Sequence, residues 1–246
     1  MKVLYLKMRK SVKIRKIIFD MLNNIYEKNA NYDQSFALFT KKIVLTENER
    51  SMIYNVVLNS MRLNFFVKNI LRNYLKKKTK RKIKILLLSA ITQIFYLDFK
   101  DYAVTNDTVE VAKSRKLNPG LVNSLLKNII HNRENLDTYK FDNDDIPFWF
   151  RNHLTKIKKI NLKIFIKSIS KEPSIHFVFK KNNFHLSFKE KFIKTTEKSA
   201  FVLTENQITE IKDYINGNWW VQDFSSMLPL YLSPEIKNKN IIDLCS

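Results

Sequence analysis

The segment 83-IKILLLSAITQIFYLDF-99 constrains the fold of this chain most strongly, because it is apolar almost all the way round a helix. Such a helix has no face to present to water, so protein must cover it on every side. No uninterrupted apolar run in the chain reaches the length of a transmembrane helix. The segment therefore predicts the central helix of a bundle.

The segments around it predict the other helices of that bundle. In 11–29, apolar residues recur at steps of three and four, and Thr46 with Glu49 forms a capping-box signal for a helix over 46–64. Residues 102–120 predict a turn, a helix and a Pro-Gly stop, and 121–130 a last helix. With no strand signal before residue 135, we expect residues 1–135 to be all-α.

The polar, acidic segment 136-LDTYKFDNDDIP-147 predicts a linker. Beyond it, helical patterns at 147–157 and 160–170 are followed by strand candidates at 174–179, 199–203 and 219–223. A helix is expected over 223–232 and a strand over 239–244. We expect a small α+β subdomain over 136–215 and the start of an α/β domain over 216–246.

Positive charge is concentrated in the first half of the chain. Residues 1–135 carry 27 Lys and Arg against 10 Asp and Glu, whereas residues 136–246 carry 17 against 13. Such asymmetry favours a polyanionic partner such as RNA. A composition rich in Lys, Asn and Ile also places lysines on solvated faces without any partner. That bias explains the lysines in general but not their uneven distribution.

The compartment is indicated by what the sequence lacks. The basic N-terminus has no apolar core followed by a small-residue cleavage site, and the single Cys245 has no internal disulfide partner. We expect a cytoplasmic monomer without a membrane segment. The four histidines and one cysteine show no metal-ligand spacing, so no metal site is expected.

The segment 89–129 resembles the helical domain of the NusB family. The resemblance is carried by an apolar helix end, an Ala-Val-x-Asn-x-x-Val-x-x-Ala-Lys pattern and a Val-Asn-x-x-Leu pattern. Here these are Gln93, Tyr96, Leu97, Ala103, Val104, Asn106, Val109, Ala112, Lys113, Val122, Asn123 and Leu126. The resemblance implies a NusB-like RNA-binding bundle.

The C-terminal stretch resembles the Sun/RsmB family of 16S rRNA cytosine-C5 methyltransferases. Val221-Gln222-Asp223-x-Ser225-Ser226 is followed by Asp243-Leu244-Cys245-Ser246, the opening of that family's cofactor motif. The resemblance implies a small RNA-binding subdomain and then a Rossmann-like domain that binds S-adenosylmethionine, with Asp243, Cys245 and Ser246 at the cofactor. The glycine-rich turn and both catalytic cysteines of the family are missing from this sequence. We therefore expect an inactive N-terminal fragment with no catalytic residue, and a poorly paired last strand.

Several of these C-terminal residues also have structural interpretations. Asp243 either supports the cofactor loop or accepts hydrogen bonds from the backbone of the following turn. Asp223 either caps a helix or contacts a ligand. At least one of Trp219 and Trp220 is expected in the core, and the other interpretation is an aromatic platform. Cys245 also suits a small buried position at a strand end.

Candidate phosphate contacts for RNA fall into four basic clusters. These are Arg9, Lys10, Lys13, Arg15 and Lys16; Lys76, Lys77, Lys78, Lys80, Arg81 and Lys82; Lys113, Arg115 and Lys116; and Lys180, Lys181 and Asn182. Such contacts position RNA without selecting a base. Each cluster taken alone is more often a solvated face than a binding site. Two other functions stay open: a non-enzymatic NusB-like module in transcription antitermination, and a general basic scaffold.

Overall fold

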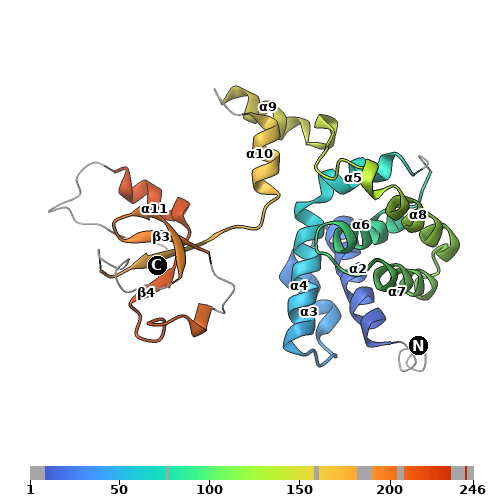
Figure 1. Cartoon of the computed structure of the whole chain (residues 1–246), viewed down its shortest axis with the longest axis horizontal. Coiled ribbons are helices and arrows are strands. Elements are labelled where there is room, and N and C mark those ends of the chain that lie inside the picture. Colours follow the sequence, from blue (N-terminus) through green and yellow to red (C-terminus); the bar gives the residue numbers. More distant parts are fainter. Residues whose placement is uncertain are drawn as a thin grey trace. The chain divides into compact units, whose positions relative to one another are not determined.

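The computed structural model describes residues 9–75, 78–157, 161–181, 190–203, 208–233 and 242. The chain folds into two compact units, residues 1–171 and residues 172–246 (Figure 1). The described part contains no helix that is both long and apolar enough to cross a membrane.

All regular secondary structure in the described residues of the first unit is helical. Its elements are α2 (Lys10–Lys28), α3 (Tyr32–Thr40), α4 (Glu47–Arg62), α5 (Asn64–Arg72), α6 (Arg81–Phe95), α7 (Asp101–Ser114), α8 (Pro119–His131), the 3₁₀ turns η1 (Arg133–Asn135) and η2 (Asn143–Asp145), α9 (Phe148–Lys156) and α10 (Leu162–Ile169). This confirms the expected all-α bundle.

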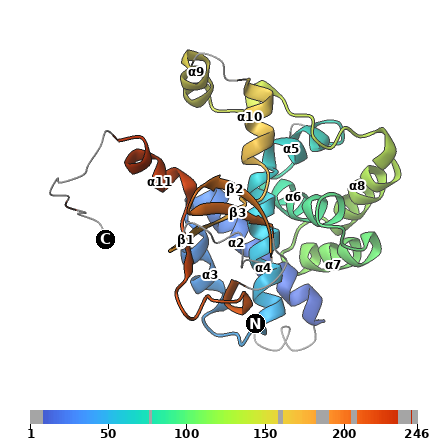
Figure 2. The same cartoon turned by 60° about the vertical axis from the view of Figure 1, so that its left-hand side comes forward.

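Helix α6 lies at the centre of this unit. It packs against α2, α4, α5, α7 and α8, which surround it in both views (Figures 1 and 2). Buried residues run almost without interruption from Ile83 to Ile94, and Leu87 and Ile91 are fully buried. The apolar sequence therefore occupies the position that its lack of a polar face predicts.

Helix α4 begins where the capping signal predicts. The Thr46 hydroxyl accepts a hydrogen bond from the Glu49 backbone N–H at 3.4 Å, and the Glu49 carboxylate accepts one from the Thr46 backbone N–H at 2.8 Å. These two bonds satisfy N–H groups that the helix itself leaves free.

Replacing Thr46 with alanine removes the hydroxyl half of this capping box. We expect the free energy of unfolding to fall by about 1 kcal/mol, the usual effect of deleting an N-cap. Urea denaturation followed by circular dichroism measures the change. Serine at position 46 retains the hydroxyl and should recover most of the loss, so equal destabilisation by serine would contradict the capping role.

The Pro-Gly pair at 119–120 begins a helix and does not end one. Pro119 is the first residue of α8, where its missing N–H costs nothing, and the Asn118 side chain caps the helix by accepting from the Leu121 N–H at 3.0 Å. Helix α7 already ends at Ser114. The expectation that this pair ends a helix was therefore wrong, although a helix does end close to it.

The segment expected to be a linker packs on the helical unit instead. Ile146 and Ile166 are buried in the main core, and Arg72 donates to Asp142 at 2.6 Å and to Asp145 at 2.8 Å. The Tyr96 hydroxyl also donates to the Thr138 carbonyl. The division between the units therefore falls between residues 171 and 172, later than the 136–147 boundary expected from composition.

The second unit contains a four-stranded antiparallel sheet. Its strands are β1 (Ile175–Phe179), β2 (Lys191–Thr196), β3 (Ser199–Leu203) and β4 (Trp219–Val221), in the order β2-β3-β1-β4, with η4 (Ile208–Glu210) and α11 (Phe224–Tyr231) beside them. Three strands and the last helix match the sequence expectations, and β2 was missed. Strand β2 alternates poorly, because three of its six residues are exposed, three are partly buried and none is fully buried, so its sequence gives a weak signal.

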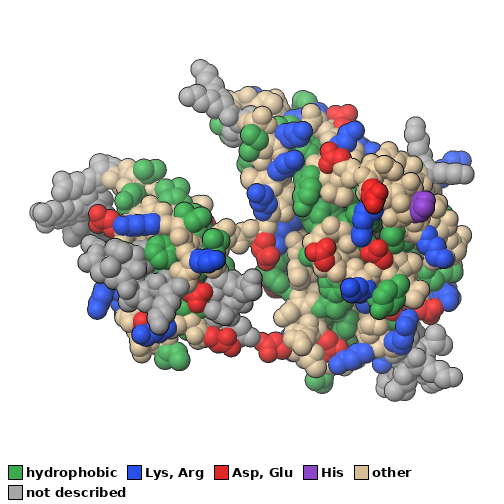
Figure 3. All heavy atoms as spheres, in the orientation of Figure 1, with side chains coloured by type: hydrophobic (Ala, Val, Ile, Leu, Met, Phe, Trp, Pro, Cys, Tyr) green, Lys and Arg blue, Asp and Glu red, His purple; other side chains and the backbone are tan. Residues whose placement is uncertain are grey.

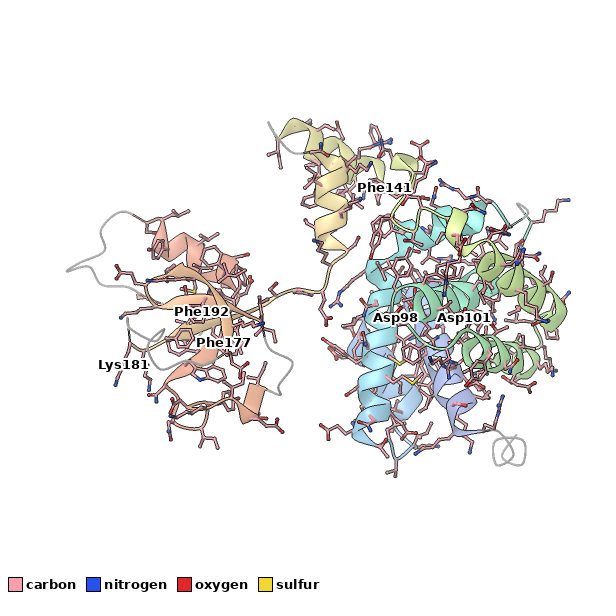
Figure 4. All side chains as sticks on the ribbon, viewed as in Figure 1. Asp98, Asp101, Phe141, Phe177, Lys181 and Phe192 are labelled. Atoms are coloured by element: carbon pink, nitrogen blue, oxygen red, sulfur yellow. The ribbon has the colours of Figure 1, made fainter. Side chains whose placement is uncertain are left out.

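Strand β4 belongs to this sheet, where it pairs with β1, Phe177 facing Val221 and Phe179 facing Trp219. Trp219 is buried and stacks on Phe177 with ring centroids 4.1 Å apart (Figure 4 labels Phe177). The α+β unit therefore continues past residue 215, where we expected a new domain to begin. Apart from Ile242, the strand expected over 239–244 lies outside the described residues.

Candidate nucleic-acid interface

An open groove on the first unit brings together residues from three separated segments. It has a volume of about 540 Å³ and lies between the start of α2, one face of α7 and the first turns of α8. Its lining residues are Arg9, Asn106, Val109, Glu110, Lys113, Pro119, Gly120, Asn123 and Lys127. Within the described part of the chain, three cations, two amides and one carboxylate thus line this cavity.

The groove attracts anions for two physical reasons. Arg9 is 64% exposed at its rim, and Lys113 and Lys127 are exposed on α7 and α8. The N-terminus of α8, including Pro119 and Gly120, also opens into it and contributes the positive end of the helix dipole. Glu110 offsets part of this charge by binding the Lys113 ammonium at 2.7 Å.

A buried carboxylate beneath the rim links the groove to the core. Asp107 is 3% exposed, and its two oxygens bind Arg9 at 3.0 Å and Arg15 at 2.8 Å. Arg15 also donates to Gln93 at 2.9 Å, and Gln93 donates to the Ser89 carbonyl at 3.1 Å. This network fixes the start of α2 against α6 and α7, and so positions Arg9.

The burial of Arg15 corrects its assignment as an RNA contact. Its side chain is 7% exposed, and its guanidinium is occupied by Asp107 and Gln93. Burial lowers the pKa of Arg15, whereas Asp107 raises it. A phosphate does not reach this group, because the helices around it exclude solvent; its role is internal.

Lys16 and Arg115 lie close to each other beside the same helices. Burial lowers the pKa of Lys16, and the neighbouring Arg115 lowers it further. Arg115 is held by an ion pair with Asp20 on α2. Lys16 is 8% exposed, so of this pair only Arg115 presents its cation to solvent.

The remaining sequence candidates are dispersed. Lys10 is exposed and binds Glu49 at 3.2 Å, Lys13 is partly buried, and Lys78, Lys80 and Lys82 are exposed before and at the start of α6. Arg81 binds Glu27 at 3.1 Å, and Lys116 is exposed after α7. Lys180 and Lys181 follow β1 in the second unit, and Figure 4 labels Lys181. Lys76, Lys77 and Asn182 lie outside the described residues.

Basic side chains are interspersed with acidic ones on the face of the first unit in Figure 3. Net charge alone therefore does not mark a binding site there, and the groove is distinguished by the three cations that line one cavity. Lys127 was missed by sequence reasoning. The signal that finds it is helical spacing, because Lys127 follows Asn123 by four residues and so shares its face of α8.

Eight of the twelve residues of the NusB-like pattern fall into two groups in the structure. Val104, Ala112, Val122 and Leu126 are fully buried in the core. Asn106, Val109, Lys113 and Asn123 line the groove. The pattern thus combines residues that pack the bundle with residues that shape one surface site.

No described residues form a cluster suited to a metal ion. His176 is buried between β1 and its neighbours, with Nδ1 2.8 Å from the Gln222 carbonyl and Nε2 2.9 Å from the Thr195 hydroxyl, so both ring nitrogens are already engaged. Of the expected cofactor residues, Asp243, Cys245 and Ser246 lie outside the described residues.

The helical bundle that carries this groove matches a known family of domains. The sequence model of the NusB family matches residues 12–131. These residues form a NusB family domain, as the resemblance in the sequence predicted.

Three solved structures resemble the chain. The antitermination factors NusB and NusE in complex with dsRNA match at 17% identity and a TM-score of 0.45, covering 50% of this chain and 98% of that one. A chain in the crystal structure of a plectonemic RNA supercoil matches at 16% identity and a TM-score of 0.45, covering 51% of this chain and 97% of that one. PH0851 matches at 13% identity and a TM-score of 0.51, covering 90% of this chain and 55% of that one. The likeness to PH0851 concerns the fold alone. No curated protein matches the sequence.

Proposed function

We propose that the first unit binds RNA through the groove between α2, α7 and α8. The observation that carries this proposal is the convergence of Arg9, Lys113 and Lys127 on one cavity. Cations at the rim neutralise phosphates, and the Asn106 and Asn123 amides donate or accept hydrogen bonds with sugar and phosphate oxygens. The groove positions the RNA backbone and does not by itself select a sequence.

Replacing Lys113 and Lys127 together with glutamine tests the groove. Binding of a short single-stranded RNA should weaken, and the slope of log K against log salt should fall by about 1.4 for two lost phosphate contacts. The matched control is Lys41→Gln with Lys42→Gln, because these exposed lysines carry the same charge and do not line the groove. Equal effects of the two double variants would mean that net charge, and not the groove, drives binding.

We further propose that the chain is the RNA-binding part of an S-adenosylmethionine-dependent 16S rRNA cytosine-C5 methyltransferase. In support, the order of parts fits: a NusB domain, an α+β unit, and the Asp243-Leu244-Cys245-Ser246 motif. The cofactor supplies the methyl group in such enzymes, and Asp243, Cys245 and Ser246 are the residues proposed to lie beside it. The chain as given is expected to be inactive, since its one cysteine belongs to the cofactor motif.

A NusB-like module in transcription antitermination is the second candidate. The family match over residues 12–131 favours it equally, because that match ends before the α+β unit. The coding DNA after Ser246 separates the two. A frame that continues through Pro-Gly-Gly-Lys and supplies two further cysteines supports the enzyme. A stop codon there contradicts the enzyme, whereas methyl transfer by the present chain contradicts its expected inactivity.

A further inference from the structure

A second cavity, of about 680 Å³, lies in the first unit between α2, α5, α6 and η2. Its mouth is basic, with Lys68 and Arg72 from α5 and Arg81 and Lys84 from α6. Among the described residues that line it, Asp145 is the one acidic residue. Its location is separate from the groove at α7 and α8, and the two sites share no lining residue.

Two of the four cations are held by protein groups and two are available. Arg72 binds Asp142 and Asp145, and Arg81 binds Glu27 and donates to the Tyr26 carbonyl. Lys68 and Lys84 are exposed and form no ion pair within the described part of the chain. The cavity therefore has two rigid arginines and two lysines that are free to bind an anion.

Behind the charged mouth, the cavity is apolar. Leu71, Ile85 and Leu88 are buried residues of the core that line it, together with Leu75. Tyr26 forms an aromatic wall, and burial raises the pKa of Tyr26 to about 12, so its hydroxyl stays neutral. Aromatic and aliphatic walls of this kind accept the flat face of a nucleobase.

Asp145 supplies an unused acceptor at this cavity. Its side chain is 10% exposed, and Oδ1 accepts from Arg72, but Oδ2 has no hydrogen-bond partner in the described structure. Burial raises the pKa of Asp145, while Arg72 and Lys68 lower it. A buried unpaired carboxylate oxygen is costly, so a ligand that brings an N–H donor is favoured.

We propose that this cavity binds one unstacked nucleotide of RNA whose base carries an exocyclic amino group. The base enters between Tyr26 and the leucines with its amino group toward Asp145, and Lys68 and Lys84 bind the adjoining phosphates. Exposed Lys78, Lys80 and Lys82 flank the mouth in sequence and extend the basic path. This inference rests on the proposed RNA binding and adds a base preference that the groove lacks.

The test compares oligocytidylate with oligouridylate on the full chain, because cytosine carries an exocyclic amino group where uracil has a carbonyl oxygen. Oligocytidylate should bind about tenfold more tightly, as expected for one hydrogen bond to a charged group. Asp145→Asn should reduce that preference to about twofold or less. Ultraviolet crosslinking of oligocytidylate should modify the peptide that contains Tyr26.

Two variants separate the parts of the cavity. Leu75→Trp fills it and should abolish the base preference and the Tyr26 adduct. Lys68→Gln with Lys84→Gln, both at exposed sites, should weaken both oligonucleotides equally and lower the salt slope by about 1.4. Circular dichroism checks that each variant is folded. If Leu75→Trp does not fold, the double variant Lys68→Gln with Lys84→Gln still tests the cavity.

Three results would overturn the inference. The first is equal binding of the two oligonucleotides, and the second is an unchanged preference in Asp145→Asn. The third is loss of the Tyr26 adduct when free cytidine monophosphate is added at a concentration that leaves the RNA bound. The last result would assign the cavity to free nucleotides. If the wild-type chain binds neither oligonucleotide, the proposed function itself fails. If the wild-type chain binds RNA without forming a Tyr26 adduct, and the Lys113 and Lys127 double variant loses binding, the groove is supported and only the second cavity is rejected.

Discussion

Replacing Asp107 with alanine is expected to lower the free energy of unfolding of the helical unit by about 3–5 kcal/mol. The reason is that Arg15, 7% exposed, would remain buried with no countercharge. Removing one partner of a buried ion pair costs far more than the pair contributes, because the remaining charge is not solvated. Chemical denaturation followed by far-ultraviolet circular dichroism measures the loss.

The matched control for Asp107 lies one turn along the same helix. Glu110 pairs with Lys113 at 2.7 Å, but both side chains are about half exposed. Glu110→Ala should therefore change stability by about 0.5 kcal/mol or less. If the Asp107 variant were no less stable than the Glu110 variant, Arg15 would have to reach solvent, and the buried network would be wrong.

Asp107→Ala should also disturb RNA binding at the groove. The carboxylate holds Arg9 at 3.0 Å, so its loss releases one of the three cations that converge there. In this unit the carboxylate that stabilises the core also positions a proposed contact residue. Stability and binding are therefore coupled through one side chain.

Replacing Trp219 with alanine is expected to destabilise the second unit by about 3–5 kcal/mol, as for other buried aromatic residues. Trp219 stacks on Phe177, and its indole N–H donates to the Lys212 carbonyl at 2.8 Å. Hydrogen exchange should show faster exchange in β1 and β3. Protection in α6 should stay unchanged, because Trp219 belongs to the core of the sheet and not to that of the helical unit.

Trp220 provides the control, because it is the next residue on the same strand. It is 42% exposed, and its indole N–H donates to the Gln222 side chain at 3.0 Å. Trp220→Ala should lower stability by about 1 kcal/mol or less. If Trp219→Ala left β1 and β3 protected, β4 would not be integral to this sheet, and the domain expected to begin at residue 216 would regain support.

The helical half is largely predictable from sequence, because local patterns specify it. The apolar run at 83–94 requires a covered helix, and Thr46 with Glu49 caps α4 through bonds that span three residues. The NusB-like pattern likewise indicates the family from residues that lie close together in the sequence. These features need no information about distant parts of the chain.

Other features depend on contacts between distant segments. Arg15 and Lys13 lie in the same basic stretch, yet only Arg15 meets a carboxylate that lies 92 residues further on in sequence. The linker composition of 136–147 does not reveal that Arg72 and the core hold this segment. Strand β2 forms because β3 pairs with it, despite its weak alternation.

The sequence by itself determined the helical class, the charge asymmetry and the family of the first domain, because periodicity, capping and motif residues act over a few positions. Only the tertiary structure decided which cations are buried, which converge on a groove, and where the two units divide. Burial and ion pairing depend on segments that are distant in sequence and adjacent in space. A set of basic residues therefore becomes a site only after folding.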